Sequence, residues 1–174
     1  MLEALTQRTV IIGNSGSGKS VFAERLAALN HVPVIDLDFL HWLDDGYRIK
    51  REEEVAKCLV RDAAAAPRWI IEGVYGWLAE IALPRASALV WLDLPWSVCR
   101  ESLVLRGQQR GGKEAGFADL LSWAEAYWDR QTSSSFGGHS RLFENFVGTK
   151  WKLHNREEVR ELLMRLAAST KTRT

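Results

Sequence analysis

Short runs of apolar, often β-branched residues alternate along the chain with segments whose apolar positions recur at helical spacing. The apolar runs predict strands at 9–12, 32–35, 69–71, 88–92 and 150–153. Helical spacing predicts helices through 21–29 and over 51–65, 96–108 and 117–130, with a last helix that begins after an Asn155 cap. Alternation of this kind is typical of an α/β protein with a parallel sheet.

Proline, serine and glycine mark several boundaries in this pattern. Pro33 lies near the start of the second strand and cannot donate to a ladder, so it predicts an edge strand. Pro67 ends the helix over 51–65, and the run Thr-Ser-Ser-Ser-Phe-Gly-Gly at 132–138 predicts a flexible loop. Since no repeat or linker divides the chain, we expect a single domain over 1–174.

Composition and charge exclude several classes. The 174 residues are 47% hydrophobic and 26% charged, as in a globular protein. Lys and Arg total 23 against 22 Asp and Glu, a balance that argues against a dedicated nucleic-acid or membrane-surface binder. The sequence shows no signal peptide and no apolar run of membrane-spanning length. With only two cysteines, we expect a cytoplasmic protein with reduced thiols.

The strongest chemical signal is a complete G-x-x-x-x-G-K-[ST] motif between a predicted strand and a predicted helix. In such a P-loop (Walker A) the glycines let backbone N–H groups point at phosphate oxygens, and the helix N-terminus adds partial positive charge. The lysine neutralises the terminal phosphates, and the final hydroxyl can ligate Mg²⁺. The complete pattern argues against a β–α turn that binds nothing. The expected nucleotide-binding residues are Gly13, Asn14, Ser15, Gly16, Ser17, Gly18, Lys19 and Ser20.

Acidic residues follow the predicted strands, at the sheet edge where ligands of such folds bind. Mg²⁺ takes one or two carboxylates and keeps several waters, so Asp36 and Glu72 are, with Ser20, the candidate metal ligands. Asp38 is the candidate for orienting an acceptor or serving as its base. Each of the three could instead cap the following helix, and for Asp93 we expect only that role.

Aromatic residues divide into core and site candidates. Trp69 and Trp91 lie within strands and are expected to pack in the core. His41, Trp42 and Tyr75 follow strand ends and are candidate substrate contacts, by stacking or hydrogen bonding, although they could also fill core. The basic and aromatic alternation at 150–152 fits a nucleic-acid surface less well than a half-buried strand.

These motifs resemble those of the adenylate-kinase-like P-loop proteins, in the nucleoside-monophosphate and shikimate kinase group. The likeness is greatest to a subgroup labelled DNA topology modulation proteins, and it spans nearly the whole chain. It rests on the P-loop at 13–20 and on the strings Ile-Asp-Leu-Asp-Phe-Leu-His-Trp at 35–42, Trp-Ile-Ile-Glu-Gly-Val-Tyr at 69–75, Val-Trp-Leu-Asp-Leu-Pro at 90–95 and Leu-Phe-Glu-Asn-Phe at 142–146.

The resemblance implies a three-layer P-loop fold with a five-stranded parallel sheet in the order 2-3-1-4-5 and a mobile basic helical lid, at about 107–140 here. It also implies ATP and Mg²⁺ as cofactors. Adenylate kinases place a phosphate-binding arginine where Arg106 stands, while Ser102 replaces the arginine expected four residues earlier. Arg106 and Arg110, with Lys113, are therefore candidates to stabilise charge on the transferred group.

One departure concerns the acceptor. In the group an aspartate and glycine after strand three are usually followed by an arginine that holds an acceptor phosphate. Here the acid is Glu72, and Val-Tyr-Gly-Trp at 74–77 contains no arginine, which argues against a monophosphate acceptor held in that way.

We expect an ATP-dependent phosphotransferase with Lys19, Asp38, Glu72, Arg106 and Arg110 as catalytic residues. Its partners are ATP and a small acceptor, which is a nucleotide, a nucleoside or a small hydroxy compound. The alternative is a nucleotide-binding ATPase or regulatory protein linked to DNA topology. The sequence leaves the acceptor and the oligomeric state open.

Overall fold

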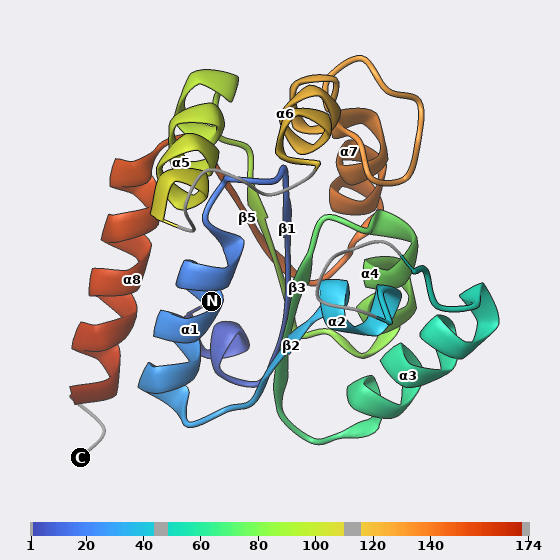
Figure 1. Cartoon of the computed structure of the whole chain (residues 1–174). Coiled ribbons are helices and arrows are strands. Elements are labelled where there is room, and N and C mark those ends of the chain that lie inside the picture. The colour runs from blue at the N-terminus through green and yellow to red at the C-terminus, as the bar shows by residue number, and fades with distance from the viewer. Residues whose placement is uncertain (1, 44–48, 110–115, 172–174) are drawn as a thin grey trace.

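The computed structural model describes residues 2–43, 49–109 and 116–171 of the chain. A five-stranded parallel sheet lies at its centre in the order β2-β3-β1-β4-β5, which confirms the predicted order and places the strand that follows Pro33 at an edge (Figure 1). The strands are β1 (Arg8–Gly13), β2 (Val34–Asp36), β3 (Trp69–Gly73), β4 (Ala88–Leu92) and β5 (Thr149–Leu153).

Helices cover both faces of this sheet (Figure 1). They are α1 (Lys19–Asn30), α2 (Leu37–His41), α3 (Glu53–Ala65), α4 (Gly76–Ala82), α5 (Trp96–Gln109), α6 (Phe117–Glu125), α7 (Phe136–Asn145) and α8 (Arg156–Lys171), with short 3-10 helices η1 (Leu2–Thr6) and η2 (Leu83–Arg85).

The core has two halves, one on each face of the sheet. Phe22 of α1 and Leu162 of α8 pack on one face, whereas Val60 of α3 and Leu78 of α4 pack on the other. This division follows the two-residue period of the strands, since adjacent side chains of β1 point to opposite faces. Trp69 and Trp91 are both buried, as the sequence predicts.

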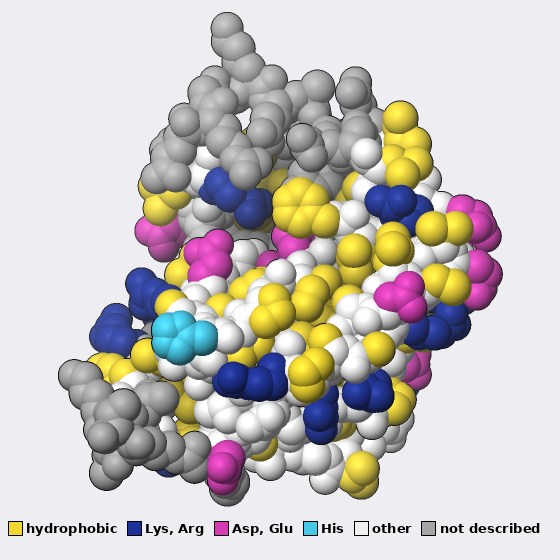
Figure 2. All heavy atoms as spheres, turned by 90° about the horizontal axis from the view of Figure 1, so that it is seen from below, with side chains coloured by type: hydrophobic (Ala, Val, Ile, Leu, Met, Phe, Trp, Pro, Cys, Tyr) yellow, Lys and Arg dark blue, Asp and Glu magenta, His cyan; other side chains and the backbone are white. Residues whose placement is uncertain are grey.

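The strand register brings the candidate chemistry to one edge. Gly13, the last residue of central β1, pairs with Leu92 of β4, and the preceding Ile12 pairs with Gly73 of β3. The P-loop therefore leaves the sheet between β3 and β4, at the carboxyl ends of all the strands. Figure 2 shows the opposite end of the molecule, where basic and acidic side chains lie dispersed among apolar ones.

The segment 117–138 differs from its predicted structure. The helix predicted over 117–130 ends at Glu125, and α7 begins at Phe136, inside the predicted flexible loop. Ser135 is buried, and its hydroxyl accepts the N–H of Gly138, so it caps α7. The Arg130 guanidinium binds the carbonyl oxygen of Ser134 at 2.9 Å and helps to order the turn.

The two cysteines lie in contrasting environments. Cys58 of α3 is exposed, whereas Cys99 of α5 is fully buried. Burial raises the pKa of the Cys99 thiol to about 11.

Candidate functional site

The P-loop curls between β1 and α1, and its three glycines all have positive φ. Gly16 has φ +79° and Gly18 has φ +92°, conformations that residues with a side chain rarely adopt. A Cβ on Gly16 would also lie 2.3 Å from the carbonyl oxygen of Cys99, so the close approach of α5 requires glycine there. The loop thus depends on the residues that define its motif.

Two polar groups in this loop fit an incoming anion. The Lys19 ammonium lies over the loop and donates to the carbonyl oxygen of Asn14 at 3.0 Å. Ser17 is fully buried, and its Oγ has no hydrogen-bond partner among the described residues. Because buried polar groups are normally partnered, this orphaned hydroxyl at a helix N-terminus fits a phosphate group of a nucleotide.

Three carboxyl groups face the loop from the neighbouring strand ends. Asp36 and Glu72 are register partners on β2 and β3, and Asp38 follows in the first turn of α2. Asp36 Oδ1 accepts the N–H of Asp38 at 2.8 Å, so Asp36 does perform the capping role that the sequence left open.

Burial raises the pKa of all three carboxyl groups, and the mutual repulsion of the acids adds to this effect. The positive charge of Lys19 opposes the rise at each of them. Titratable groups with raised pKa values, grouped around one buried cation, are typical of a functional site.

Ser20 and Glu72 form the candidate Mg²⁺ position. The Ser20 hydroxyl lies close enough to the Glu72 carboxyl group to oppose the rise in the pKa of Glu72, so two hard oxygen donors lie together. Within 2–43, 49–109 and 116–171, no group of three or more His, Cys, Asp or Glu side chains is arranged to hold a metal. Such a donor set fits Mg²⁺ shared with nucleotide phosphates and water rather than a site made by protein alone.

The candidate acceptor residues cluster around Asp38. The Trp42 indole N–H donates to the Tyr75 hydroxyl at 2.7 Å, and the Tyr75 hydroxyl lies close enough to the Asp38 carboxyl group to oppose the rise in the pKa of Asp38. The ring centroids of His41 and Tyr75 are 4.4 Å apart. His41 is buried, its Nδ1 lacks a partner among the described residues, and burial lowers its pKa. The structure therefore brings His41, Trp42, Tyr75 and Asp38 together at one place.

The candidate arginines divide into one that the structure describes and one that it does not. Arg106 lies on α5, and its positive charge opposes, weakly, the rise in the pKa of Asp38 that burial causes. Arg110 and Lys113 lie outside the described residues.

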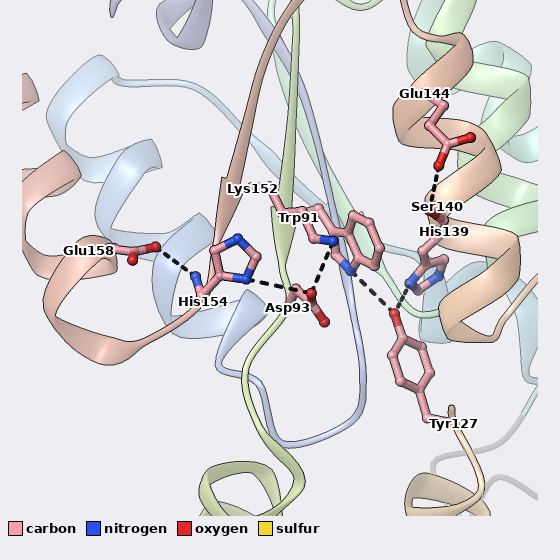
Figure 3. A network of polar contacts seen from close by, with 9 residues as sticks. All are labelled: Trp91, Asp93, Tyr127, His139, Ser140, Glu144, Lys152, His154 and Glu158. Atoms are coloured by element: carbon pink, nitrogen blue, oxygen red, sulfur yellow. Dashed lines mark hydrogen bonds and ion pairs between the residues drawn. The ribbon is translucent and has the colours of Figure 1, made fainter. Parts of the chain in front are cut away.

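Beside the site, a buried relay joins β4, α7 and the loop after β3 (Figure 3). The Trp91 indole N–H lies 3.2 Å from the Tyr127 hydroxyl, which is 2.7 Å from His139 Nδ1. His139 Nε2 is 3.0 Å from the carbonyl oxygen of Val74. A carbonyl can only accept, so Nε2 carries the proton and Nδ1 accepts from Tyr127. Burial lowers the pKa of His139 to about 3, which keeps the relay neutral.

The lysines of β5 serve local contacts. Lys150 Nζ donates to the carbonyl oxygens of Phe143, Glu144 and Phe146 at the end of α7. Lys152 Nζ lies 3.9 Å from the centre of the Trp91 ring and 3.1 Å from Asp93 Oδ2 (Figure 3). Asp93 thus forms an ion pair across the strands that its predicted capping role did not include.

Sequence reasoning missed two contacts of the P-loop. The Asn14 side-chain amide donates to the carbonyl oxygen of Ala124 at 2.8 Å and so ties the loop to α6. Arg156, the first residue of α8, donates to the carbonyl oxygen of Ser17 at 3.1 Å. A cation at a helix N-terminus interacts unfavourably with the helix dipole. This unusual position of Arg156, directly after the predicted Asn155 cap, could have indicated that its side chain has another role.

Comparison with known proteins adds one relative. Over 126 residues the chain is 30% identical to the uncharacterized protein YqaC of Bacillus subtilis (strain 168), covering 67% of this chain and 70% of YqaC. The chain belongs to the YqaC family. No protein-family model matches it.

Solved structures show that this YqaC-family chain has a P-loop kinase fold. A gluconokinase from Sinorhizobium meliloti 1021 matches with a TM-score of 0.56 at 20% identity, over 97% of this chain and 95% of that one. Shikimate kinase from Acinetobacter baumannii matches with a TM-score of 0.57 at 13% identity, over 100% and 99%. No helix among the described residues is long and apolar enough to cross a membrane.

Proposed function

We propose that this chain is an ATP-dependent phosphotransferase that transfers the γ-phosphoryl group to a hydroxyl group of a small acceptor. The observation that carries the proposal is the position of Asp38. This carboxyl group lies within electrostatic reach of Lys19 in the P-loop and of Arg106 on α5. A base for the acceptor and cations for the transferred group thus converge on one point. The gluconokinase and shikimate kinase structures, whose names refer to hydroxylated acceptors, support this proposal.

In this proposal each residue has a distinct role. The P-loop amides and Lys19 bind the phosphates, and Arg106 and Arg110 stabilise charge on the transferred group. Asp38 takes the proton of the acceptor hydroxyl while the hydroxyl oxygen forms a bond to the γ-phosphorus. The bond between the γ-phosphorus and the β–γ bridging oxygen breaks, and ADP leaves. Ser20 and Glu72, with Asp36 beside them, hold Mg²⁺, which neutralises phosphate charge when bound.

The acceptor in this proposal bears hydroxyl groups that Asp38 and Tyr75 recognise, with His41 and Trp42 beside them. We place the lid at about 107–140, with its later part held by the buried residues Ala124, Tyr127 and His139. Affiliation with the DNA topology modulation subgroup rests on the sequence strings alone. No observation favours the DNA-linked alternative, since Lys150 and Lys152 both serve local contacts.

An ADP-release screen over nucleosides, nucleoside monophosphates, sugars and small hydroxy acids, with a no-acceptor control, tests the proposal. We expect one acceptor class to accelerate ADP release. Asp38→Asn should lower that acceptor-dependent rate about 10²- to 10⁴-fold, the usual contribution of a general base. Asp62→Asn, at an exposed position of α3, is the matched control. Equal ADP release with and without every acceptor would instead identify an ATPase.

A further inference from the structure

Arg156 joins three separate parts of the molecule through one guanidinium group. Its Nη1 donates to the carbonyl oxygen of Ser17 at 3.1 Å, and its Nη2 lies 3.5 Å from the carbonyl oxygen of Gly16. The same Nη2 donates to Ser102 Oγ of α5 at 2.7 Å. The guanidinium therefore contacts the P-loop from outside while holding the neighbouring helix.

The location of this arginine is unfavourable for α8 itself. Arg156 is the first residue of the helix, where backbone N–H groups concentrate partial positive charge. The next residues, Glu157 and Glu158, are the kind that stabilises such an end. The hydrogen bonds of Arg156 to the P-loop and to α5 offset this unfavourable interaction with the helix dipole.

Its two backbone contacts act on the amides of the P-loop. In a planar trans peptide the N–H points away from the carbonyl, so binding the oxygens of Gly16 and Ser17 orients the N–H groups of Ser17 and Gly18 toward the loop interior. The N–H of Ser17 does point inward, since it donates to the carbonyl oxygen of Asn14 at 3.2 Å. A Cβ on Gly18 would lie 2.5 Å from Arg156 Nη1, so a side chain there would displace the guanidinium.

The third contact reaches the helix that carries a candidate catalytic cation. Ser102 lies four residues before Arg106, on the same face of α5. Through Ser102, the guanidinium links the position of α5 to that of the P-loop.

We propose that Arg156 is a positioning residue for the bound triphosphate. It holds the P-loop amides in their phosphate-binding arrangement and ties the loop to α5. The inference rests on the proposed nucleotide binding, but it makes a separate claim, because it assigns Arg156 to the phosphate chain and not to the nucleoside.

Titration calorimetry with Mg·ATP and with inorganic tripolyphosphate, which has no nucleoside, separates these roles. Arg156→Gln should weaken both ligands by the same factor of about ten, as expected when a charged hydrogen bond is lost. Arg156→Lys keeps the charge without the planar fork and should recover part of this loss. Ser102→Ala should have a smaller effect, and Arg160→Gln, on the same helix but paired with Glu157, should have none.

Each outcome of this titration decides the point. Equal weakening of both ligands, with recovery by lysine, supports the positioning role. Weakening of Mg·ATP alone assigns Arg156 to the nucleoside and overturns it, as do unchanged affinities. A wild-type chain that binds neither ligand refutes the proposed function instead. Thermal melting checks folding, and if Arg156→Gln does not melt cooperatively, Arg156→Lys and Ser102→Ala carry the same comparison of ligands.

Discussion

Two groups of buried polar residues lie at the same end of the sheet, and they differ in how completely they are satisfied. In the relay of Trp91, Tyr127 and His139, every polar group has a neutral partner. At the P-loop, raised-pKa carboxyl groups surround one lysine, and Ser17 Oγ and His41 Nδ1 lack partners in the described chain. A satisfied network adds rigidity, whereas unsatisfied groups retain capacity for a ligand. We therefore assign stability to the first region and chemistry to the second.

The largest test of this division is Lys19→Ala. It should reduce Mg·ATP turnover at least about 10³-fold, equivalent to about 4 kcal/mol of transition-state stabilisation, because this charge meets the phosphates. The melting temperature should change little. An ADP-release assay measures turnover, titration calorimetry measures ATP affinity and circular dichroism measures the melting temperature, with Lys57→Ala on α3, remote from the P-loop in sequence and paired with Glu53, as the control. Wild-type ATP affinity in Lys19→Ala would contradict the assignment of phosphate binding to the P-loop region.

His139→Phe tests the other region. The substitution leaves the Tyr127 O–H without its acceptor and the Val74 carbonyl without its donor in the interior, so it should lower the free energy of unfolding by about 3 kcal/mol. Chemical denaturation measures this loss. Ser140→Ala, which removes only an exposed hydrogen bond to Glu144 from the same helix, is the matched control.

The relay also predicts how stability depends on pH. Its histidine has a pKa lowered from 6.5 to about 3, so the unfolded chain binds the proton more tightly than the folded one. Stability from this group is complete above 6.5 and is lost as the pH falls toward 3. His139→Phe should remove that part of the acid sensitivity, and an unchanged pH profile would contradict a neutral buried histidine.

Glu72→Gln is expected to have the smallest effect on stability. It distinguishes the two regions because it should change stability and activity in opposite directions. Burial raises the Glu72 pKa above 4.5, so the folded state favours the protonated form and loses stability as the pH rises through that raised pKa. At neutral pH a glutamine should therefore raise the free energy of unfolding by about 1 kcal/mol. The Mg²⁺-dependent rate should fall more than nucleotide affinity.

Thermal melting and Mg²⁺ titrations measure the two effects, with Glu80→Gln on the exposed side of α4 as the control. Equal losses of rate and affinity, or lower stability at neutral pH, would argue against the role assigned to Glu72.

Periodicity and strand-end logic predicted much of this fold. The apolar runs located all the strands of the sheet, and Pro33 placed β2 at an edge because a missing N–H cannot be tolerated inside. The resemblance supplied the strand order. The P-loop, the acids and the aromatic residues after β2 and β3 were found because parallel strands present their carboxyl ends at one edge.

The remaining features depend on contacts that are distant in sequence. Helix α7 was missed because Gly137 and Gly138 are typical of loops, yet Gly138 is required there by the Ser133 carbonyl, which would lie 2.3 Å from a Cβ. The partners of His139 lie 12 and 65 residues away. Arg156 is separated from Ser17 by 139 residues, a pairing that no local pattern specifies.

The contrast between the two cysteines has a practical consequence. Maleimides react with exposed thiolates. Cys58 lies on the surface of α3 and is accessible to them, whereas burial shields Cys99 and its raised pKa keeps it a thiol. The unmodified protein thus offers one site for attaching a fluorophore or spin label, without any cysteine being removed.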